Sequence, residues 1–333
     1  MMIPKMQEMP TSSEAVNPQK EKKLIHSITN NSGILIAFII LCIFFSITSE
    51  AFLTSANILS VLRQISINAI IALGMTLIIL IRGIDLSVGS IVAVSGTFSV
   101  GLLVDGFSIP IAICISLLLA IAIGFINGFI TSKGKMPSFI VTLAMMTMAR
   151  GLAYVYTGGL PLRYDASPVF NAIGNGYIGP IPVPIIIMIV CVIIISILLN
   201  RTKFGRYVYA IGGNPEAARF SGINIKRIEI IVFTISGFFA GLAGIILASR
   251  LSSGQPTAGQ GFELDAIAAV VLGGTSFNGG IGKISGTIIG ALIIGVLSNG
   301  LNLMHVPFYY QLIIKGAVII GAVYIDSIKK NNL

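Results

Sequence analysis

Long apolar runs separated by short polar stretches make up most of the chain after residue 30. A helix of about 20 apolar residues spans the ~30 Å hydrocarbon core of a bilayer, because each residue adds about 1.5 Å along the axis. Ten runs approach this length, at 32–49, 65–81, 87–104, 109–130, 138–157, 183–200, 228–249, 264–275, 286–304 and 308–325. The pattern predicts an all-α fold, a polytopic transmembrane helix bundle of about ten spans. Small residues one turn apart, such as Gly124/Gly128 and Gly237/Gly241, predict close packing between helices.

The eighth run differs from the others in its length and in the way it ends. Residues 264–275 are too few for a full crossing, and they lead into the glycine-rich sequence LGGTSFNGGIGK at 272–283. Irregular backbone is tolerated at membrane depth only where protein or a water-filled cavity surrounds it. We therefore expect a broken or re-entrant element buried in protein, which leaves nine or eleven spans as alternatives to ten.

The placement of basic residues predicts how the bundle is oriented. If the N-terminus is inside, 16 of the 21 Lys and Arg residues fall in inside loops and tails, 3 fall outside and 2 lie within spans. Cytoplasmic loops of membrane proteins carry such an excess of Lys and Arg. Both termini are therefore predicted to be cytoplasmic. Residues 1–30 are expected to form a disordered tail and 327–333 a short tail, on either side of a transmembrane domain over 31–326.

Composition agrees with an integral membrane protein and argues against one class of partner. Hydrophobic residues make up 55% of the 333 and charged residues 10%, whereas soluble domains carry about 25% charged residues. The net charge of +9 is spread among the loops and is not gathered on one face. For that reason no nucleic-acid partner is expected.

The polar and basic interruption at 201–227 contains a short sequence with the start and stop signals of a helix. Asn214 suits the N-cap, Pro215 the first helical position, and Gly222 the left-handed position that ends a helix. About eight residues are too few for a helix to be stable alone in water. The segment is therefore either one turn of a surface loop or a helix packed on its own domain or on a partner. It comprises Asn214, Pro215, Glu216, Ala217, Ala218, Arg219, Phe220, Ser221 and Gly222.

Motifs for nucleotide, metal and hydrolytic chemistry are missing from the sequence. The nearest match to a phosphate-binding loop, Gly282-Lys283-Ile284, lacks the Ser or Thr and the upstream glycine of that motif. His26 and His305 have no Cys, Asp or Glu at zinc-ligand spacing, and no span contains a histidine that could act as a base. We therefore expect no enzyme activity, no metal and no cofactor bound by this chain.

Polar residues along the spans are candidates for a translocation path, because uncharged amides and hydroxyls suit a neutral, hydroxylated solute. The same residue types also join helices to one another, so this indication is weak. Asp85 is favoured as the N-cap of the span at 87–104 over a contact with solute. Arg150 has two alternatives of equal weight, a contact in the path or a stabilising bond in the bundle. The candidates are Asn68, Asp85, Asn127, Thr142, Arg150, Ser236, Asn299 and Asn302.

The ionisable residues in the spans argue against a carrier driven by an ion gradient. Such carriers bury carboxylates near the bilayer centre, but the two residues placed within spans, Arg150 and Lys315, are basic. Glu263 and Asp265 are expected, like Asp85, to open a helix. An ion-coupled sugar carrier that works alone is the main alternative, and a sensory or scaffold membrane protein without transport is a second one.

Five long stretches resemble the membrane permease subunit of ribose-type ABC importers, the simple-sugar branch of that superfamily. They are GMTLIILIRGIDLSVGS (74–90), PSFIVTLAMMTMARG (137–151), TKFGRYVYAIGGNPEAARFSGINIKRI (202–228), ASRLSSGQPTAGQGFELDAIAAVVLGGTSFNGGIGKISGT (248–287) and NGLNLMHVPFYYQLIIKG (299–316). The resemblance covers nearly the whole chain after residue 30. One departure is Arg82, which stands before GIDLS where a small or polar residue is more usual.

The resemblance implies partners, a substrate and a role for the polar stretch. It implies a homodimer in the bacterial plasma (inner) membrane, with two cytoplasmic ATPase modules that bind ATP and an extracytoplasmic sugar-binding protein. In the family, the loop that matches 202–228 contains the coupling helix that docks on the ATPase, which corresponds here to residues 214–222. Ribose is the leading substrate, and another monosaccharide (xylose, allose or galactose) or a furanose-like signal molecule is the alternative.

Overall fold

The structure is a computed structural model that describes residues 18–164 and 167–331. Within these ranges, the helices long and apolar enough to cross a membrane are α2 (Ser55–Leu80), α4 (Ile109–Gly134), α5 (Ser138–Thr157), α7 (Val183–Arg201), α10 (Ile225–Leu251) and α12 (Ile284–Leu303). The others are α1 (Pro18–Thr48), α3 (Val88–Val104), α6 (Pro168–Asn175), α8 (Lys203–Gly213), α9 (Pro215–Phe220), α11 (Phe262–Leu272) and α13 (Phe308–Asn331). The strands have two residues each: β1 (Leu162–Arg163) pairs with β4 (Ser253–Gly254), and β2 (Tyr177–Ile178) with β3 (Ile181–Pro182), both antiparallel.

The predicted class, a polytopic bundle made almost entirely of helices, is confirmed. Six of the ten predicted spans meet the length and composition expected of a membrane-crossing helix. The runs predicted at 32–49, 87–104 and 308–325 lie in α1, α3 and α13, whose apolar portions are shorter. The total of ten therefore stays a prediction.

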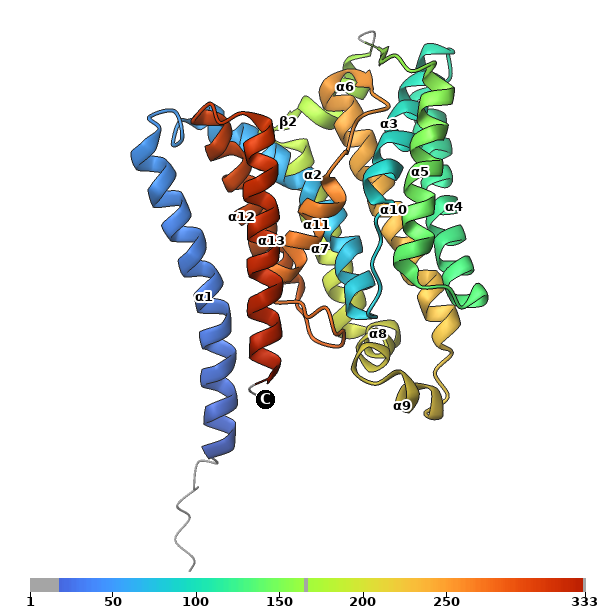
Figure 1. Ribbon diagram of the computed structural model, residues 1–333. Coiled ribbons are helices and arrows are strands. Elements are labelled where there is room, and N and C mark those ends of the chain that lie inside the picture. Colours follow the sequence, from blue (N-terminus) through green and yellow to red (C-terminus); the bar gives the residue numbers. More distant parts are fainter. Residues whose placement is uncertain (1–17, 165–166, 332–333) are drawn as a thin grey trace, which may run out of the picture.

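The long helices, together with the short α11 between α10 and α12, follow one another in alternating directions, so that their connections gather at the two ends of the bundle (Figure 1). The Pro18 end of α1, the helices α8 and α9, and the last described turn of α13 lie at one end. The helix α6 and the β2–β3 hairpin lie at the other. Both described ends of the chain are thus on the same side as the basic stretch 201–227. That this side is cytoplasmic stays a prediction from the charges.

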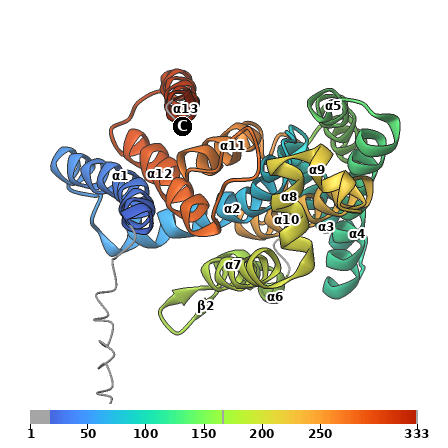
Figure 2. The same cartoon turned by 90° about the horizontal axis from the view of Figure 1, so that it is seen from below.

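The two central helices are α2 and α10. Seen along the bundle (Figure 2), α1, α12 and α13 lie on one flank and α4 and α5 on the opposite one, with α2 and α10 between them. The run 65–80 of α2 is buried throughout. A helix that is apolar on every side, as this one is, is typical of the interior of a large bundle.

Glycines let α10 pack directly on its neighbours, as the small-residue pattern predicts. A Cβ atom on Gly124 of α4 would lie 2.5 Å from the carbonyl oxygen of Phe233, and one on Gly237 of α10 would lie 2.5 Å from that of Ala120. Neither site has room for a side chain, so the two backbones are in contact. Such packing replaces the hydrophobic effect, which does not drive helix association in lipid.

Three segments differ from the sequence prediction. Residues 18–30, predicted as part of a disordered tail, form the first turns of α1, while residues 1–17 lie outside the described residues. Gln, Lys and Glu, frequent in 18–23, are good helix formers, which explains the helix. Residues 203–213, for which no helix was predicted, form α8. The connection at 158–182, for which no helix or strand was predicted, contains α6 and the β2–β3 hairpin.

The eighth predicted span is a broken element, as expected. The eleven residues of α11 rise about 16 Å, half the thickness of the hydrocarbon core, and Asp265–Val271 are buried. A run of turns at 256–261 precedes α11, and the glycine-rich loop 273–283 follows it. The first half of the chain has a similar feature, because an irregular segment at 81–87 separates the end of α2 from α3.

Candidate functional site

The helix α9 has the caps that its sequence predicts. The Asn214 side-chain oxygen accepts a hydrogen bond from the backbone N–H of Ala217 at 3.0 Å, so Asn214 is the N-cap. At the other end Gly222 has a φ of +81°, and the N–H of Ile223 donates to the carbonyl of Ala218 at 3.1 Å. This left-handed turn satisfies carbonyls that a helix end leaves without partners. The predicted boundaries at Asn214 and Gly222 are confirmed.

Most of α9 faces away from the protein. Of its six residues only Ala218 is buried, and the Phe220 ring is 88% exposed. Glu216 lies in its first turn and Arg219 in its last, where each charge opposes the adjacent end of the helix dipole. α9 therefore presents a capped, partly apolar surface at the end of the bundle.

The preceding helix, α8, holds α9 in place and was missed in the sequence. Thr202 is its N-cap, with its hydroxyl accepting from the N–H of Gly205 at 3.3 Å. Val208 and Ile211 are buried, and Phe204 also packs against the core. The spacing of these apolar residues, four and then three, is a helical pattern that could have been recognised. Half-burial raises the pKa of the Tyr209 hydroxyl, which donates to the carbonyl of Gly282 at 2.9 Å.

A second polar region lies inside the bundle around Asp85. Its carboxyl group accepts from the backbone N–H and the hydroxyl of Ser87, at 2.9 and 2.6 Å, and from the hydroxyl of Ser236 in α10 at 3.2 Å. Asn127 of α4 donates to the Ser87 oxygen at 2.9 Å. All four residues are buried. We call Asp85, Ser87, Asn127 and Ser236 the buried cluster. Ser87 was missed in the sequence.

The prediction that Asp85 caps the third span is wrong. The N-cap of α3 is Ser87, and its side chain makes no cap hydrogen bond. Asp85 lies two residues earlier, in the irregular segment 81–87, where the groups around it come from α3, α4 and α10. Thr142 of α5 completes the surroundings, because its hydroxyl lies 3.2 Å from the carbonyl of Ile84.

Arg150 in α5 bonds to the turn segment 256–261 before α11. One guanidinium nitrogen donates to the carbonyls of Pro256 and Ala258 at 2.7 and 2.6 Å. Of the two alternatives for this residue, the structure shows a bond within the bundle. The second basic residue in the spans, Lys315 of α13, pairs with Asp265 of α11 at 2.9 Å.

Carboxyl groups therefore do lie inside the bundle, contrary to the prediction from the sequence. Asp85 is fully buried and Asp265 is 7% exposed. Asp85 lies just before α3 and Asp265 lies in the first turn of α11. Both helices begin inside the bundle and not at its surface, which is why the two carboxyl groups are buried. Among the described residues no group of three His, Cys, Asp or Glu side chains could hold a metal ion.

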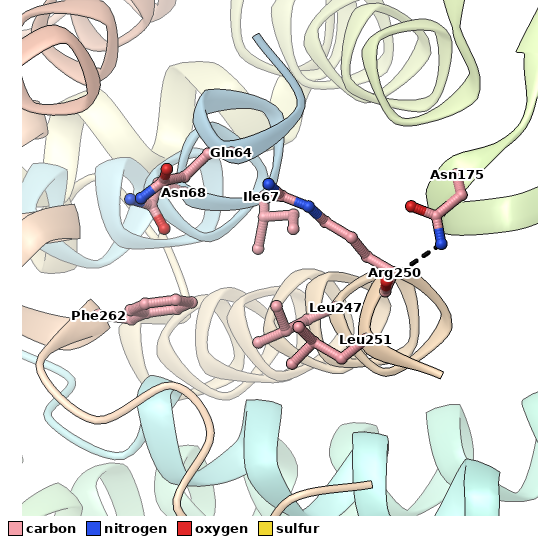
Figure 3. Close-up of a pocket in the computed structure, with 8 residues that line it drawn as sticks. All are labelled: Gln64, Ile67, Asn68, Asn175, Leu247, Arg250, Leu251 and Phe262. Atoms are coloured by element: carbon pink, nitrogen blue, oxygen red, sulfur yellow. Dashed lines mark hydrogen bonds between the residues drawn. The ribbon is translucent and has the colours of Figure 1, made fainter. Parts of the chain in front are cut away.

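A cavity of about 320 Å³ lies between the N-terminal half of α2 and the C-terminal end of α10 (Figure 3). Such a volume is at the lower end of the range for small-molecule sites. The Asn68 side chain is 7% exposed and its oxygen has no hydrogen-bond partner. Asn175 donates to the Arg250 carbonyl at 3.0 Å. The lining residues are Gln64, Ile67, Asn68, Asn175, Leu247, Arg250, Leu251 and Phe262.

The remaining path candidates lie elsewhere. The Asn299 amide exchanges hydrogen bonds with Asn57 at 2.9 and 3.1 Å, and Asn302 accepts from Gln311 at 2.8 Å. The structure thus brings Asp85, Asn127 and Ser236 together, with Thr142 beside them. Asn68, Arg150 and the two asparagines of α12 are separate from this group.

Comparison with known proteins identifies the family. A family model described as a permease component of branched-chain amino acid transport systems matches residues 57–323. The ribose import permease protein RbsC of Bacillus subtilis is 49% identical over 93% of this chain and 98% of its own length. The D-allose permease AlsC of Escherichia coli is 41% identical (87% of this chain, 89% of that protein), and the L-arabinose ABC transporter permease AraH of Azospirillum brasilense is 37% identical (97% and 95%). No solved structure matches.

These matches cover the bundle and both polar regions described above. They concern transport components of the membrane and not enzymes. The chain belongs to this family of permease components, in the branch of ribose-type, simple-sugar ABC importers.

Proposed function

We propose that this chain is the membrane-spanning subunit of an importer that carries ribose inward, driven by ATP that a partner subunit binds. The support for ribose is the difference in identity, 49% to the ribose relative against 41% and 37% to the allose and arabinose relatives, at similar coverage. Another monosaccharide or a furanose-like signal molecule is the alternative substrate.

The proposed assembly has two copies of this chain in the bacterial plasma membrane. Two cytoplasmic ATPase modules and an extracytoplasmic sugar-binding protein complete it. The observation that carries the coupling role is the surface of α9, where Phe220 is 88% exposed on a helix with one buried residue. A helix of this length needs packing to persist, and a partner that covers Phe220 would supply it.

The mechanism we propose is alternating access. Closure of the ATPase pair on ATP moves the two α9 helices, from Asn214 to Gly222, as rigid levers. This movement shifts a path at the subunit interface between two states. The bonds at each end of α9 lie within the segment itself, so the helix can move without unfolding.

The path candidates have different expected roles. Asp85, Asn127, Thr142 and Ser236 are buried and already hydrogen-bonded, so they would meet a sugar only in another state of the bundle. Asn68 has a free oxygen at the wall of the outer cavity, and Asn302 is exposed. Arg150 and Asn299 are bonded but only partly buried.

The coupling role is tested by deleting residues 214–222 and, more finely, by Phe220→Asp. Both variants should enter the membrane folded, lose the ATPase on co-purification and lose ATP-dependent ribose uptake in proteoliposomes with the binding protein. Leu160→Asp is a matched control, because Leu160 is also an exposed apolar residue (72%) but lies at the other end of the bundle; it should keep the ATPase. Normal uptake by the deletion variant would refute the proposal.

A second candidate, an ion-coupled sugar carrier that works alone, gains one observation from the structure. Asp85 and Asp265 are buried carboxyl groups, and such groups carry coupling ions in ion-driven carriers. Liposomes that contain this chain alone, with a proton or sodium gradient and labelled ribose, decide between the two. Concentrative uptake without ATP would favour the carrier.

A further inference from the structure

Three segments of the chain meet where α8 ends. They are the end of α2 with its following turn, Leu80–Gly83, the last residues of α8, and the loop that joins α11 to α12. The N–H of Gly280 in that loop donates to the Leu80 carbonyl at 2.9 Å. The Arg82 guanidinium donates to the carbonyls of Gly212 and Gly213, at 2.8 and 2.7 Å. We call this meeting point the junction; α8 and the lower end of α2 lie side by side in Figures 1 and 2.

Backbone atoms touch at the junction, with no side chain between them. A Cβ atom on Gly212 would collide with the Leu80 carbonyl oxygen and the Gly280 nitrogen, and one on Gly280 would lie 2.6 Å from the Gly213 nitrogen. A displacement of α8 therefore reaches the other two segments directly. Packed elements of this kind shift between discrete arrangements and do not deform smoothly.

Arg82 gives the junction its polar bonds. Its backbone has a left-handed φ of +67°, which directs the side chain to the end of α8. The last carbonyls of a helix lack partners within the helix and carry partial negative charge. The Arg82 guanidinium group donates hydrogen bonds to two of these carbonyls and places a positive charge beside them. Tyr209 adds a second connection, from within α8 to the carbonyl of Gly282.

The bonds of Arg82 and Tyr209 lead to the two irregular segments inside the bundle, 81–87 before α3 and the loop 273–283 before α12. Two residues after Arg82, the N–H of Ile84 donates to the Ser138 hydroxyl of α5 at 3.0 Å, and Asp85 then enters the buried cluster. One residue after Gly282 the chain reaches Lys283, the N-cap of α12, where Gly286 packs directly on Gly273. The junction thus joins α8 and α9 to the segments before α3 and before α12.

We propose that Arg82 and Tyr209 are the positioning residues that transmit movement of α9 into the membrane. Arg82 acts on the segment that carries Asp85, and Tyr209 acts on the loop between α11 and α12. The proposal rests on the coupling role proposed for α9. It adds that a substitution at the junction can reduce sugar transport while the ATPase still docks on α9 and still hydrolyses ATP.

The experiment measures ribose uptake and ATP hydrolysis in the same proteoliposomes, with the full complex and the sugar-binding protein. Arg82→Met removes both donors and keeps the length of the side chain. The variant complex should assemble and hydrolyse ATP, but the ribose carried per ATP should fall roughly tenfold, within the range of coupling between distant sites. Tyr209→Phe removes one neutral hydrogen bond and should lower the ratio about threefold. Arg82→Lys, which keeps the charge but not the forked donors, should fall between wild type and Arg82→Met.

Lys135→Met is the matched control. Lys135 is also basic, follows the inner end of α4, has a left-handed φ of +54°, and makes no side-chain hydrogen bond or ion pair within the described parts of the chain. This variant should keep the wild-type ratio. A purely structural role for Arg82 would lower assembly and both rates together, without changing ribose per ATP.

Two results would overturn the inference. One is a wild-type ratio in Arg82→Met, and the other is loss of the ATPase from that complex, which would place Arg82 in docking. Either result, together with loss of uptake in the 214–222 deletion, leaves the proposed coupling role intact. Normal uptake in the deletion variant refutes the coupling role itself, whatever Arg82→Met does. If Arg82→Met does not fold, Arg82→Lys and Tyr209→Phe carry the test.

Discussion

The helix α9 and the buried cluster are both polar features of an apolar chain, yet they are specified in opposite ways. The cap of α9 joins residues three positions apart. In the buried cluster, Ser87 donates two bonds to Asp85 two positions away, but the bonds that bring in Asn127 and Ser236 join residues 40 and 151 positions apart. One feature is complete within nine consecutive residues, while the other exists only when α3, α4 and α10 have packed together.

This difference predicts what each region contributes. A locally specified helix with one buried residue can be lost or moved with little effect on the bundle. A cluster that joins several helices stabilises the bundle, because its bonds break only when the helices separate. Substitutions in the buried cluster and at similar interhelical bonds should therefore lower stability, whereas those in α9 should affect coupling only.

The largest effect on stability is expected for Asp85→Ala. The change leaves the N–H of Ser87 and the hydroxyls of Ser87 and Ser236 without their acceptor, inside the protein. Since a buried donor without a partner costs about 1–3 kcal/mol, we expect a loss of about 3 kcal/mol in the free energy of unfolding. Titration of the purified protein with SDS in mixed micelles measures it.

Asp105→Ala is the control for this measurement. Asp105 is an exposed carboxylate at the end of α3, so its removal should change stability by no more than about 0.5 kcal/mol. If the two variants unfold alike, the buried cluster does not hold the bundle together, and the contrast with α9 fails.

The ion pair between Lys315 and Asp265 should give the next largest effect. Lys315→Met leaves the Asp265 carboxylate, whose side chain is 9% exposed, without its partner. Because the Lys315 side chain is 20% exposed and the pair is therefore not fully buried, we expect a loss of about 2 kcal/mol, within the cost of a buried group without a partner. The double variant Lys315→Met/Asp265→Leu should recover part of that loss, because no charge is left buried. Additive losses in the double variant would show that the pair is not coupled.

The contrast between local and distant contacts also explains what the sequence could predict. The caps of α9, close packing at Gly124 and Gly237, and the broken element at α11 were predicted, because each depends on a few neighbouring residues; that α4 and α10 are the helices that meet at these glycines was not. The surroundings of Asp85 were not, since a capping position is the ordinary role of an Asp before a helix. Ser87 is a local neighbour of Asp85, but that Asn127 and Ser236 join these two residues depends on how the helices pack, and no local pattern contains this. The partner of Lys315 was missed for the same reason.

Arg150→Met tests an interaction that is intermediate between the locally specified α9 and the buried cluster. Arg150 belongs to a regular helix, but its two acceptors, Pro256 and Ala258, are in a turn segment more than 100 residues away. Hydrogen bonds between membrane helices contribute about 0.6–1.7 kcal/mol each, so a loss of about 1–2 kcal/mol is expected. Arg163→Met, at an exposed arginine of β1, should be neutral in the same titration. A neutral Arg150→Met would mean that the stretch before α11 holds its shape without this residue.

Asn214→Ala should have the smallest effect on stability and a clear effect on transport. Loss of an N-cap costs a helix end about 0.5–2 kcal/mol, but α9 buries one residue, so its fraying should hardly change the free energy of unfolding. If α9 is the coupling lever, ATP-dependent ribose uptake should nevertheless fall, because a frayed helix cannot move as a unit. Asn214→Ser, which can also cap, should restore uptake. A loss of stability comparable with that of Asp85→Ala would show that α9 is part of the bundle's core after all, and the distinction between the two regions would then be one of position only.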